Sequence, residues 1–501
     1  LFGGSAVLLA AFLALAGSAV ERAQQQLQAT ATIAPAQAAS SFIVQGDSAT
    51  HAAAAVLAAG GEAIQELVII NGVEAKLSQN AVKVLEDQQL RVTANAKVST
   101  AARKLRDAQT TLTPLASSTD DSPSQWDPKD NAFATLLTGA NELHDQGITG
   151  SGVTIAVVDS GVWDYGSMVT ADDYSKQLLA TYDATASHNP EKARMVDDNG
   201  HGTHVTSIMS TSYRHDGFYR GIAPSARLVV ARAFDEQGRG TYADVIEAID
   251  WIVANREAYN VRVLNLSLSA PARSHYWDDP LNQAVMAAWQ AGIVVVASAG
   301  NTGPDPMTIG VPGNVPYVVT VGAMTDRFSP DDPSDDVVAS FSSAGPTYEG
   351  FVKPELVAPG GHISGYMKSG TTIASEHPEY IDWETSMGYT MSGTSQAADA
   401  VSGVVALMLQ VDPLLTPDDA TCRVMASARR AHDMGVGAES LVYWDSEVAY
   451  GDQTRALVNT SDARSIDSHR AVPCLRAVER ATSRRFGISR LRQGGVPDSR
   501  V

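Results

Sequence analysis

The sequence has 501 residues, enough at about 100–200 residues per domain for two to four domains, which excludes a peptide, a toxin or a disulfide-stapled miniprotein. Acidic residues outnumber basic residues by 56 to 36, giving a formal net charge of −20, while 44% of residues are hydrophobic and 18% are charged. This composition is typical of a folded, soluble chain. Its acidity argues against a nucleic-acid partner, because phosphate binding needs a basic face.

An apolar segment near the start of the sequence predicts export. Residues 6–16 (AVLLAAFLALA) have the length of a signal-peptide core, and the small residues Gly17-Ser18-Ala19 that follow suit a signal peptidase. The run is too short to span a bilayer reliably. We therefore expect a signal peptide over residues 1–19, a secreted or periplasmic protein and no stable membrane anchor; a buried core helix or an anchor is the alternative.

Two cysteines, Cys422 and Cys474, are too few for a disulfide scaffold and lack the spacing of a zinc site. They form either one disulfide or two inert thiols, and export favours the disulfide.

A linker over residues 20–40, rich in Ala and Gln, precedes a small domain over residues 41–99. Strands are expected over 41–45, within 63–77 as a pair turning at Asn71-Gly72, and over 90–98. Helices are expected over 51–59 and from Ser78, as the cap, through Asp87. The order β-α-β-β-α-β within about 60 residues predicts a ferredoxin-like α+β domain.

A larger domain is expected over residues 126–460, after a polar connection over 100–125 that suits proteolytic nicking. Apolar strands are predicted over 153–159, 226–234, 261–268, 293–299 and 317–323, with helices over 243–256, 281–291 and from Thr416 to about Arg429. Continuous Val/Ile strands alternating with helices predict a mainly parallel sheet in a three-layer α/β domain. Residues 461–501 are a polar, Arg-rich C-terminal extension.

Three motifs at the ends of predicted elements carry candidate catalytic residues. They are VVDSG with Asp159 at the end of a strand, NGHGTHV with His201 opening a helix, and MSGTSQ with Ser395 at the start of another helix. A serine hydroxyl needs a nearby base, and histidine titrates near neutral pH. A buried carboxylate can hold that imidazole in one tautomer. His204 is the alternative base, although a packed or capping histidine fits its position better.

The three motifs, their order and the predicted fold resemble the subtilisin-like serine proteases, or subtilases, over about residues 150–430. The resemblance implies a serine endopeptidase that hydrolyses proteins and peptides through an acyl-enzyme on Ser395. It also implies that residues 41–99 are an inhibitor-type propeptide, an intramolecular inhibitor that is removed by self-cleavage in the connection after it. No cofactor is needed for this chemistry. The acidic loop over residues 326–336 either holds a structural calcium ion or is simply solvated.

The resemblance also assigns residues that would bind the substrate. Asn301 matches an oxyanion-binding asparagine, the alternative being a turn former beside glycine, and the backbone N–H of Ser395 would be the second donor. Substrate should add as a β-strand along residues 266–270. The residues expected to bind substrate are Ser267, Leu268 and Ser269 on this strand and Ala297, Ser298, Ala299 and Gly300 in the wall of the primary pocket. Ser269 and Ala270 replace glycines common in the family and should crowd the pocket mouth.

Two departures follow the nucleophile: Gln396 stands where the family has methionine and Asp399 where it has proline. Asp399 is either a favourable charge at a helix start or a carboxylate that perturbs His201. These departures motivate one alternative function, a catalytically impaired pseudoprotease that binds peptides. A second alternative is a processing protease selective for one substrate.

Overall fold

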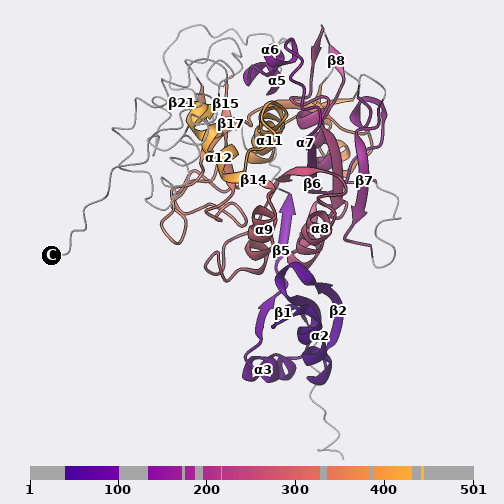
Figure 1. Ribbon diagram of the computed structural model, residues 1–501, viewed down its shortest axis with the longest axis vertical. Coiled ribbons are helices and arrows are strands. Elements are labelled where there is room, and N and C mark those ends of the chain that lie inside the picture. The colour runs from indigo at the N-terminus through magenta and orange to yellow at the C-terminus, as the bar shows by residue number, and fades with distance from the viewer. Residues whose placement is uncertain are drawn as a thin grey trace, which may run out of the picture. The chain divides into compact units, whose positions relative to one another are not determined.

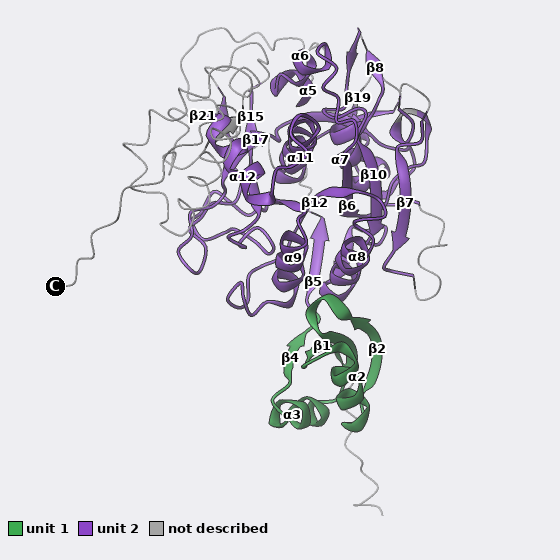
Figure 2. Ribbon diagram, viewed as in Figure 1, with its two compact units in different colours: residues 1–95 green, residues 96–501 purple. Residues whose placement is uncertain are grey.

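The computed structural model describes residues 40–100, 134–171, 175–186, 196–215, 217–327, 336–382, 387–430 and 442–444. The chain divides into two compact units, Leu1–Asn95 and Ala96–Val501 (Figure 2). The signal peptide, the two linkers and the C-terminal extension predicted from the sequence lie outside the described residues, apart from Ser40 and Thr100.

The smaller unit has the predicted order of elements, β1-α2-β2-β3-α3-β4. Its antiparallel sheet has the strand order β2-β3-β1-β4. Ser48 and Ser78 cap the two helices with their hydroxyl groups, and Asn71 turns the chain before β3 with a positive φ of 53°. The bounds are β1 Ser40–Gln45, α2 Ala49–Ala58, β2 Glu62–Leu67, η1 Val68–Ile70, β3 Gly72–Leu77, α3 Gln79–Asp87 and β4 Arg91–Ala94.

The predicted strand over residues 90–98 is wrong as a single element. β4 ends at Ala94, and a second strand, β5 (Lys97–Thr100), belongs to the larger unit. There β5 lies between β11 (Arg239–Thr241) and β13 (Leu268–Ser269), antiparallel to both. The chain leaves the first sheet where its pairing with β1 ends, opposite Phe42.

The larger unit is built on a ten-stranded sheet with the order β21-β22-β17-β15-β14-β12-β6-β10-β7 and β16 beside β15. All pairings along this order are parallel except that of β21, and β16 is also antiparallel. The parallel strands are β6 Thr154–Asp159, β7 Leu178–Asp183, β10 Arg227–Arg232, β12 Val261–Leu266, β14 Val294–Ser298, β15 Val319–Thr325, β17 Leu356–Pro359 and β22 Val442–Trp444. The antiparallel ones are β16 Val337–Val338 and β21 Ala428–Arg430.

Helices cover both faces of this sheet, as the three-layer prediction requires (Figure 1). On one face α7 (His201–Ser210) packs against α11 (Thr394–Val411), and on the other α8 (Tyr242–Ala254) packs against α9 (Pro280–Gln290). In β6, Ile155 and Val157 join the core beneath α11, whereas Ala156 and Val158 point to the opposite face and are also fully buried. The sequence therefore predicted the fold class correctly.

The remaining described elements surround these layers. They are α5 Ala134–Leu137, α6 Ala140–His144, η3 Gly166–Met168, β8 Arg214–His215, β9 Phe218–Tyr219, β18 Ile363–Tyr366, α10 Thr372–Glu376, η5 Pro378–Tyr380, β19 Ile381–Asp382, β20 Gly388–Met391 and α12 Pro417–Ser427. Thr416 and Asp419 form a capping box at the start of α12, as the sequence suggests. Over the described ranges, no helix combines the length and apolarity that a membrane span needs.

Candidate active site

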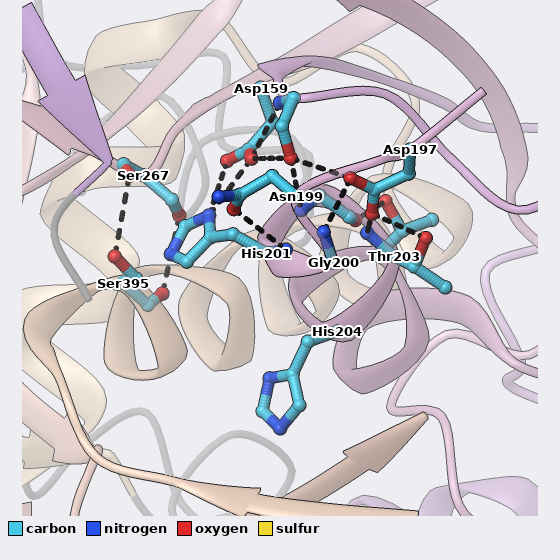
Figure 3. Close-up of polar contacts among 12 residues, drawn as sticks. Asp159, Asp197, Asn199, Gly200, His201, Thr203, His204, Ser267 and Ser395 are labelled. Carbon is cyan, nitrogen blue, oxygen red and sulfur yellow. Dashed lines mark hydrogen bonds and ion pairs between the residues drawn. The ribbon is translucent and has the colours of Figure 1, made fainter. Parts of the chain in front are cut away.

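The candidate base and its carboxylate partner come together at the carboxyl end of the parallel sheet. Asp159 is the last residue of β6 and His201 is the first residue of α7 (Figure 3). His201 Nδ1 lies 2.8 Å from Asp159 Oδ1 and 3.0 Å from Oδ2, and both side chains are 0% exposed. Ligand sites of open α/β sheets are found at this edge.

Local backbone geometry explains the glycines around His201. Gly200 adopts a φ of 103°, a conformation that disfavours residues with a Cβ. A Cβ on Gly202 would collide with the carbonyl oxygen of Gly161, which follows β6. The glycines therefore let the start of α7 approach the end of β6 closely enough for His201 to reach Asp159.

A second aspartate, Asp197, connects the start of α7 to the residues that follow β6. The sequence analysis did not identify it. Its Oδ1 accepts hydrogen bonds from Gly200 N at 2.7 Å and Ser160 Oγ at 2.9 Å. Its Oδ2 accepts from Thr203 N at 2.7 Å and Thr203 Oγ1 at 2.6 Å. Asp197 thus satisfies orphan donors at the start of α7 and links them to Ser160, beside Asp159. The only sequence signal for Asp197 was its position shortly before the start of α7, where acidic side chains often accept hydrogen bonds from backbone N–H groups.

Ser395, the candidate nucleophile, lies in the first turn of α11, in the same cluster as His201 (Figure 3). Its hydroxyl donates to the carbonyl oxygen of Ser267 at 3.3 Å. His201 Nε2 is buried and has no hydrogen-bond partner among the described residues. In this conformation the Ser395 hydroxyl therefore points towards Ser267, and Nε2 of His201 has no hydrogen-bond partner among the described residues.

The electrostatic surroundings favour a protonated His201. Burial lowers the pKa of its imidazole, but the charge of Asp159 and the hydrogen bond to it outweigh burial, with a smaller contribution from the Asp197 carboxylate. The net effect raises this pKa above its usual value. His204, the alternative base, is different: burial lowers its pKa to about 4, and its Nε2 hydrogen-bonds to the Tyr389 carbonyl at 2.9 Å. His204 is therefore a packed histidine.

Asn301, the candidate oxyanion donor, contacts Thr394, the first residue of α11. Its Oδ1 accepts hydrogen bonds from Thr394 N at 3.0 Å and Thr394 Oγ1 at 2.9 Å. This pair of bonds fixes the carboxamide with its oxygen towards the start of α11 and its NH₂ group turned away from Thr394. The structure thus brings Asn301 to the residue that precedes Ser395.

The predicted substrate edge is already paired with a segment of this chain. In β13, Leu268 stands opposite Thr100 and Ser269 opposite Ser99 of β5. On its other side, β5 pairs with β11, and Gly240 stands opposite Val98. β11 and β13 therefore lie one strand apart, and β5 pairs with both of them as an added strand.

The residues predicted for the pocket wall lie beside this edge. Ala297 and Ser298 end β14, Ala299 and Gly300 follow, and all four are buried. Ser298 Oγ donates to the Leu268 carbonyl at 2.9 Å, which joins wall and edge. A Cβ added to Gly300 would lie 3.0 Å from Ser269 Oγ. The Ser269 side chain therefore faces this wall, and its effect on a substrate pocket remains a prediction.

The expectation that Asp399 is a charge at a helix start is wrong. α11 begins at Thr394, so Asp399 lies in its second turn, and its side chain is 0% exposed. Its Oδ1 accepts from Ser267 Oγ at 2.8 Å and from Asn265 Nδ2 at 3.0 Å. Gln396 is also buried, and its Nε2 lies 3.4 Å from Nδ1 of His204.

The residues predicted to bind calcium and to form a disulfide lie mostly outside the described part of the chain. The part of the chain that the structure describes holds no cluster of three or more His, Cys, Asp or Glu side chains suited to a metal ion, and most of the acidic loop over 326–336 is outside it. Cys422 is buried on α12, while Cys474 lies outside the described residues. The calcium site and the disulfide remain predictions.

Comparison with known proteins agrees with this geometry. Serine protease AprX of Bacillus subtilis is 39% identical over 294 residues, 57% of this chain and 64% of that protein. Subtilisin E of the same organism is 32% identical over 291 residues, covering 58% and 64%. The chain thus matches just under two thirds of the length of these relatives.

Among solved structures, fervidolysin from Fervidobacterium pennivorans, a keratinolytic enzyme related to subtilisin, aligns with a TM-score of 0.59 at 21% identity, over 82% of this chain and 60% of that one. At this identity the alignment supports the fold alone. A family model described as the subtilase family matches residues 150–458, more than half of the chain. With the fold, the relatives and this match in agreement, the chain belongs to the subtilase family.

Proposed function

We propose that this protein is a secreted serine endopeptidase, made as a zymogen, that hydrolyses peptide bonds of proteins through an acyl-enzyme. The observation that carries the proposal is the buried Asp159–His201 pair at the carboxyl end of β6, with Ser395 at the start of the neighbouring helix. Membership of the subtilase family supports the same reaction. Export is supported by the signal-peptide pattern of residues 1–19.

In the proposed mechanism, Ser395 Oγ attacks the substrate carbonyl carbon while His201 Nε2 takes the hydroxyl proton. Asp159 keeps Nδ1 protonated and stabilises the imidazolium, which then donates its proton to the leaving amine. The oxyanion would receive hydrogen bonds from the Asn301 carboxamide and the backbone N–H of Ser395. The start of α11 favours that negative charge, because the first N–H groups of a helix have no partners within it. Water then hydrolyses the acyl-enzyme by the reverse sequence.

The zymogen part of the proposal rests on β5. This strand occupies the position in which a substrate would pair with β13, and its register brings Thr100 opposite Leu268. Leu268, which stands opposite Thr100, directly follows Ser267, whose carbonyl accepts the Ser395 hydroxyl. We therefore propose that the chain cleaves itself at the first or second peptide bond after Thr100. The smaller unit would then be the propeptide that acts as intramolecular inhibitor.

Labelling of the purified protein with a fluorophosphonate probe tests the proposal, together with hydrolysis of casein. We expect covalent labelling at Ser395 and casein hydrolysis that the probe abolishes. Ser395→Ala is the matched control and should show neither. A properly folded wild-type protein that binds peptides without being labelled would contradict the proposal in favour of a pseudoprotease. Cleavage of a single sequence from a peptide library would instead indicate a selective processing protease.

A further inference from the structure

Asp399 is a buried carboxyl group close to the candidate nucleophile that the proposed mechanism does not use. Both hydrogen bonds to it reach the same atom, Oδ1, from Ser267 and Asn265. Its Oδ2 is buried and has no hydrogen-bond partner among the described residues. Asn265 belongs to β12 and Ser267 follows that strand, so Asp399 connects α11 to the segment that leads into β13.

The contact between Asp399 and Ser267 matters for the reaction because Ser267 also contacts Ser395, the candidate nucleophile. Its carbonyl accepts the Ser395 hydroxyl, and its own hydroxyl lies 3.3 Å from the Ser395 carbonyl. The next residue, Leu268, begins the strand that pairs with β5. A displacement of Ser267 would therefore move the substrate edge relative to the nucleophile.

The charges around Asp399 favour its neutral form. The titratable groups that act on it are His201, from α7, and Asp159, from β6, and Asp159 already holds His201 through a direct hydrogen bond. Its two donors, a serine hydroxyl and an asparagine amide, are neutral. An ionised carboxylate that is fully buried without a contacting cation is strongly disfavoured. In agreement with this, burial raises the pKa of Asp399 well above its usual value, although the bonds from Ser267 and Asn265 and the charge of His201 oppose it.

We propose that Asp399 is a positioning residue that joins the nucleophile helix to the substrate edge and acts as a neutral carboxylic acid. The inference rests on the serine endopeptidase function proposed above and deepens it. The carbonyl oxygen of the neutral acid accepts both donors, while no further negative charge is placed near the developing oxyanion. Ionisation of Asp399 as the pH rises through its raised pKa would add that charge, oppose the oxyanion and slow acylation.

Two substitutions separate the acceptor from the charge. Asp399→Asn keeps a carbonyl acceptor and is neutral at every pH, whereas Asp399→Leu has a similar size but no acceptor. We expect Asp399→Asn to retain kcat/KM within about threefold near neutral pH, because the same acceptor remains. Asp399→Leu should lose about 10²-fold, with lower kcat and higher KM, because nucleophile and substrate edge are no longer aligned. As the pH rises through the raised pKa of Asp399, wild-type kcat/KM should fall with an ionisation that Asp399→Asn lacks.

Val405→Ala is the matched control, since Val405 is a buried residue of α11 three turns beyond Ser395 and contributes to the main core. It should lower stability while leaving the pH profile unchanged. All rates are normalised to the fraction of enzyme labelled by fluorophosphonate. Equal losses in Asp399→Asn and Asp399→Leu would show that the charge is needed, and wild-type rates in Asp399→Leu would show that no positioning occurs; either result overturns the proposal.

A stability measurement does not depend on activity. In the Ser395→Ala background, which cannot digest itself, a neutral buried Asp399 stabilises the fold at low pH. This contribution is lost as the pH rises from the unfolded pKa of about 4 through the raised folded value. Asp399→Asn should therefore become progressively more stable than its parent as the pH rises, and a constant difference would overturn the neutral form. If wild-type protein is never labelled, the proposed function fails, but this arm still decides the charge state.

Discussion

The hydrogen bond between His201 and Asp159 makes Asp159→Asn the most informative substitution. Both side chains are fully buried, and both carboxylate oxygens lie within 3.0 Å of Nδ1. An asparagine can turn its NH₂ group towards Nδ1, which then becomes an acceptor, so that the imidazole proton moves to Nε2. In that tautomer Nε2 cannot take the proton of Ser395.

The size of the effect follows from the loss of the base. We expect kcat to fall about 10⁴-fold, which at 1.36 kcal/mol per factor of ten corresponds to about 5.4 kcal/mol of transition-state stabilisation. The acid limb of the pH profile of kcat/KM should also move, to lower pH. Asp159 supplies the charge and hydrogen bond that raise the pKa of His201 against its burial. Without them burial dominates, this pKa falls, and the acid limb of kcat/KM moves to lower pH.

The assay is the pH dependence of peptide-ester hydrolysis by mature Asp159→Asn, after processing by a trace of tagged wild-type enzyme that is then removed. Circular dichroism at each pH controls for unfolding. A slower enzyme whose acid limb stays in place or moves to higher pH would refute the assigned origin of the His201 pKa. A decrease in kcat of less than tenfold would refute the role of the pair.

Three further predictions concern the nucleophile, the oxyanion donor and the pocket. Ser395→Ala should accumulate as uncleaved precursor, whereas wild-type protein should begin one or two residues after Thr100; mass spectrometry of a mature chain beginning before residue 60 would contradict this. Asn301→Ala should lower kcat by roughly 10²–10³ with little change in KM, because the donor acts mainly in the transition state; a loss confined to KM would make Asn301 a substrate-binding residue. Ser269→Gly should raise kcat/KM for large aromatic residues about tenfold relative to alanine, as a peptide library can show, because the pocket mouth gains space; an unchanged ratio would mean that Ser269 does not limit the pocket.

The sequence was most informative where local pattern and tertiary position coincide. Continuous Val/Ile runs identified the central strands β6, β10, β12, β14 and β15, because a strand buried on both faces needs apolar residues at every position. The motif positions of Asp159 and His201 were sufficient to predict that they meet. The edge strand β7 was not predicted because exposed and polar positions interrupt its apolar pattern. The short β17 was missed because it has only four residues and ends in proline.

Other features depended on contacts between distant segments, which no local pattern reveals. One example is the hydrogen bond between Asp197 and Ser160. Another is the placement of β5 in a different sheet from β4. The sequence left Asp399 open between a charge at a helix start and a carboxylate near His201, because acidic residues are common near helix starts. Its burial follows from Asn265 and Ser267, which lie more than 130 residues earlier in the chain.

The place of β5 between β11 and β13 has a consequence for the timing of activity. A segment tethered to its own binding site is present there at an effective concentration in the millimolar range. Protein substrates with typical KM values of about 1 μM–1 mM must compete against it, so substrate at micromolar concentration has little access. Once the chain is cleaved after β5, the fixed effective concentration no longer applies. The concentration of the released segment then falls as the protein is diluted. If the chain is exported and cleaves itself as proposed, dilution after export would be the event that starts proteolysis.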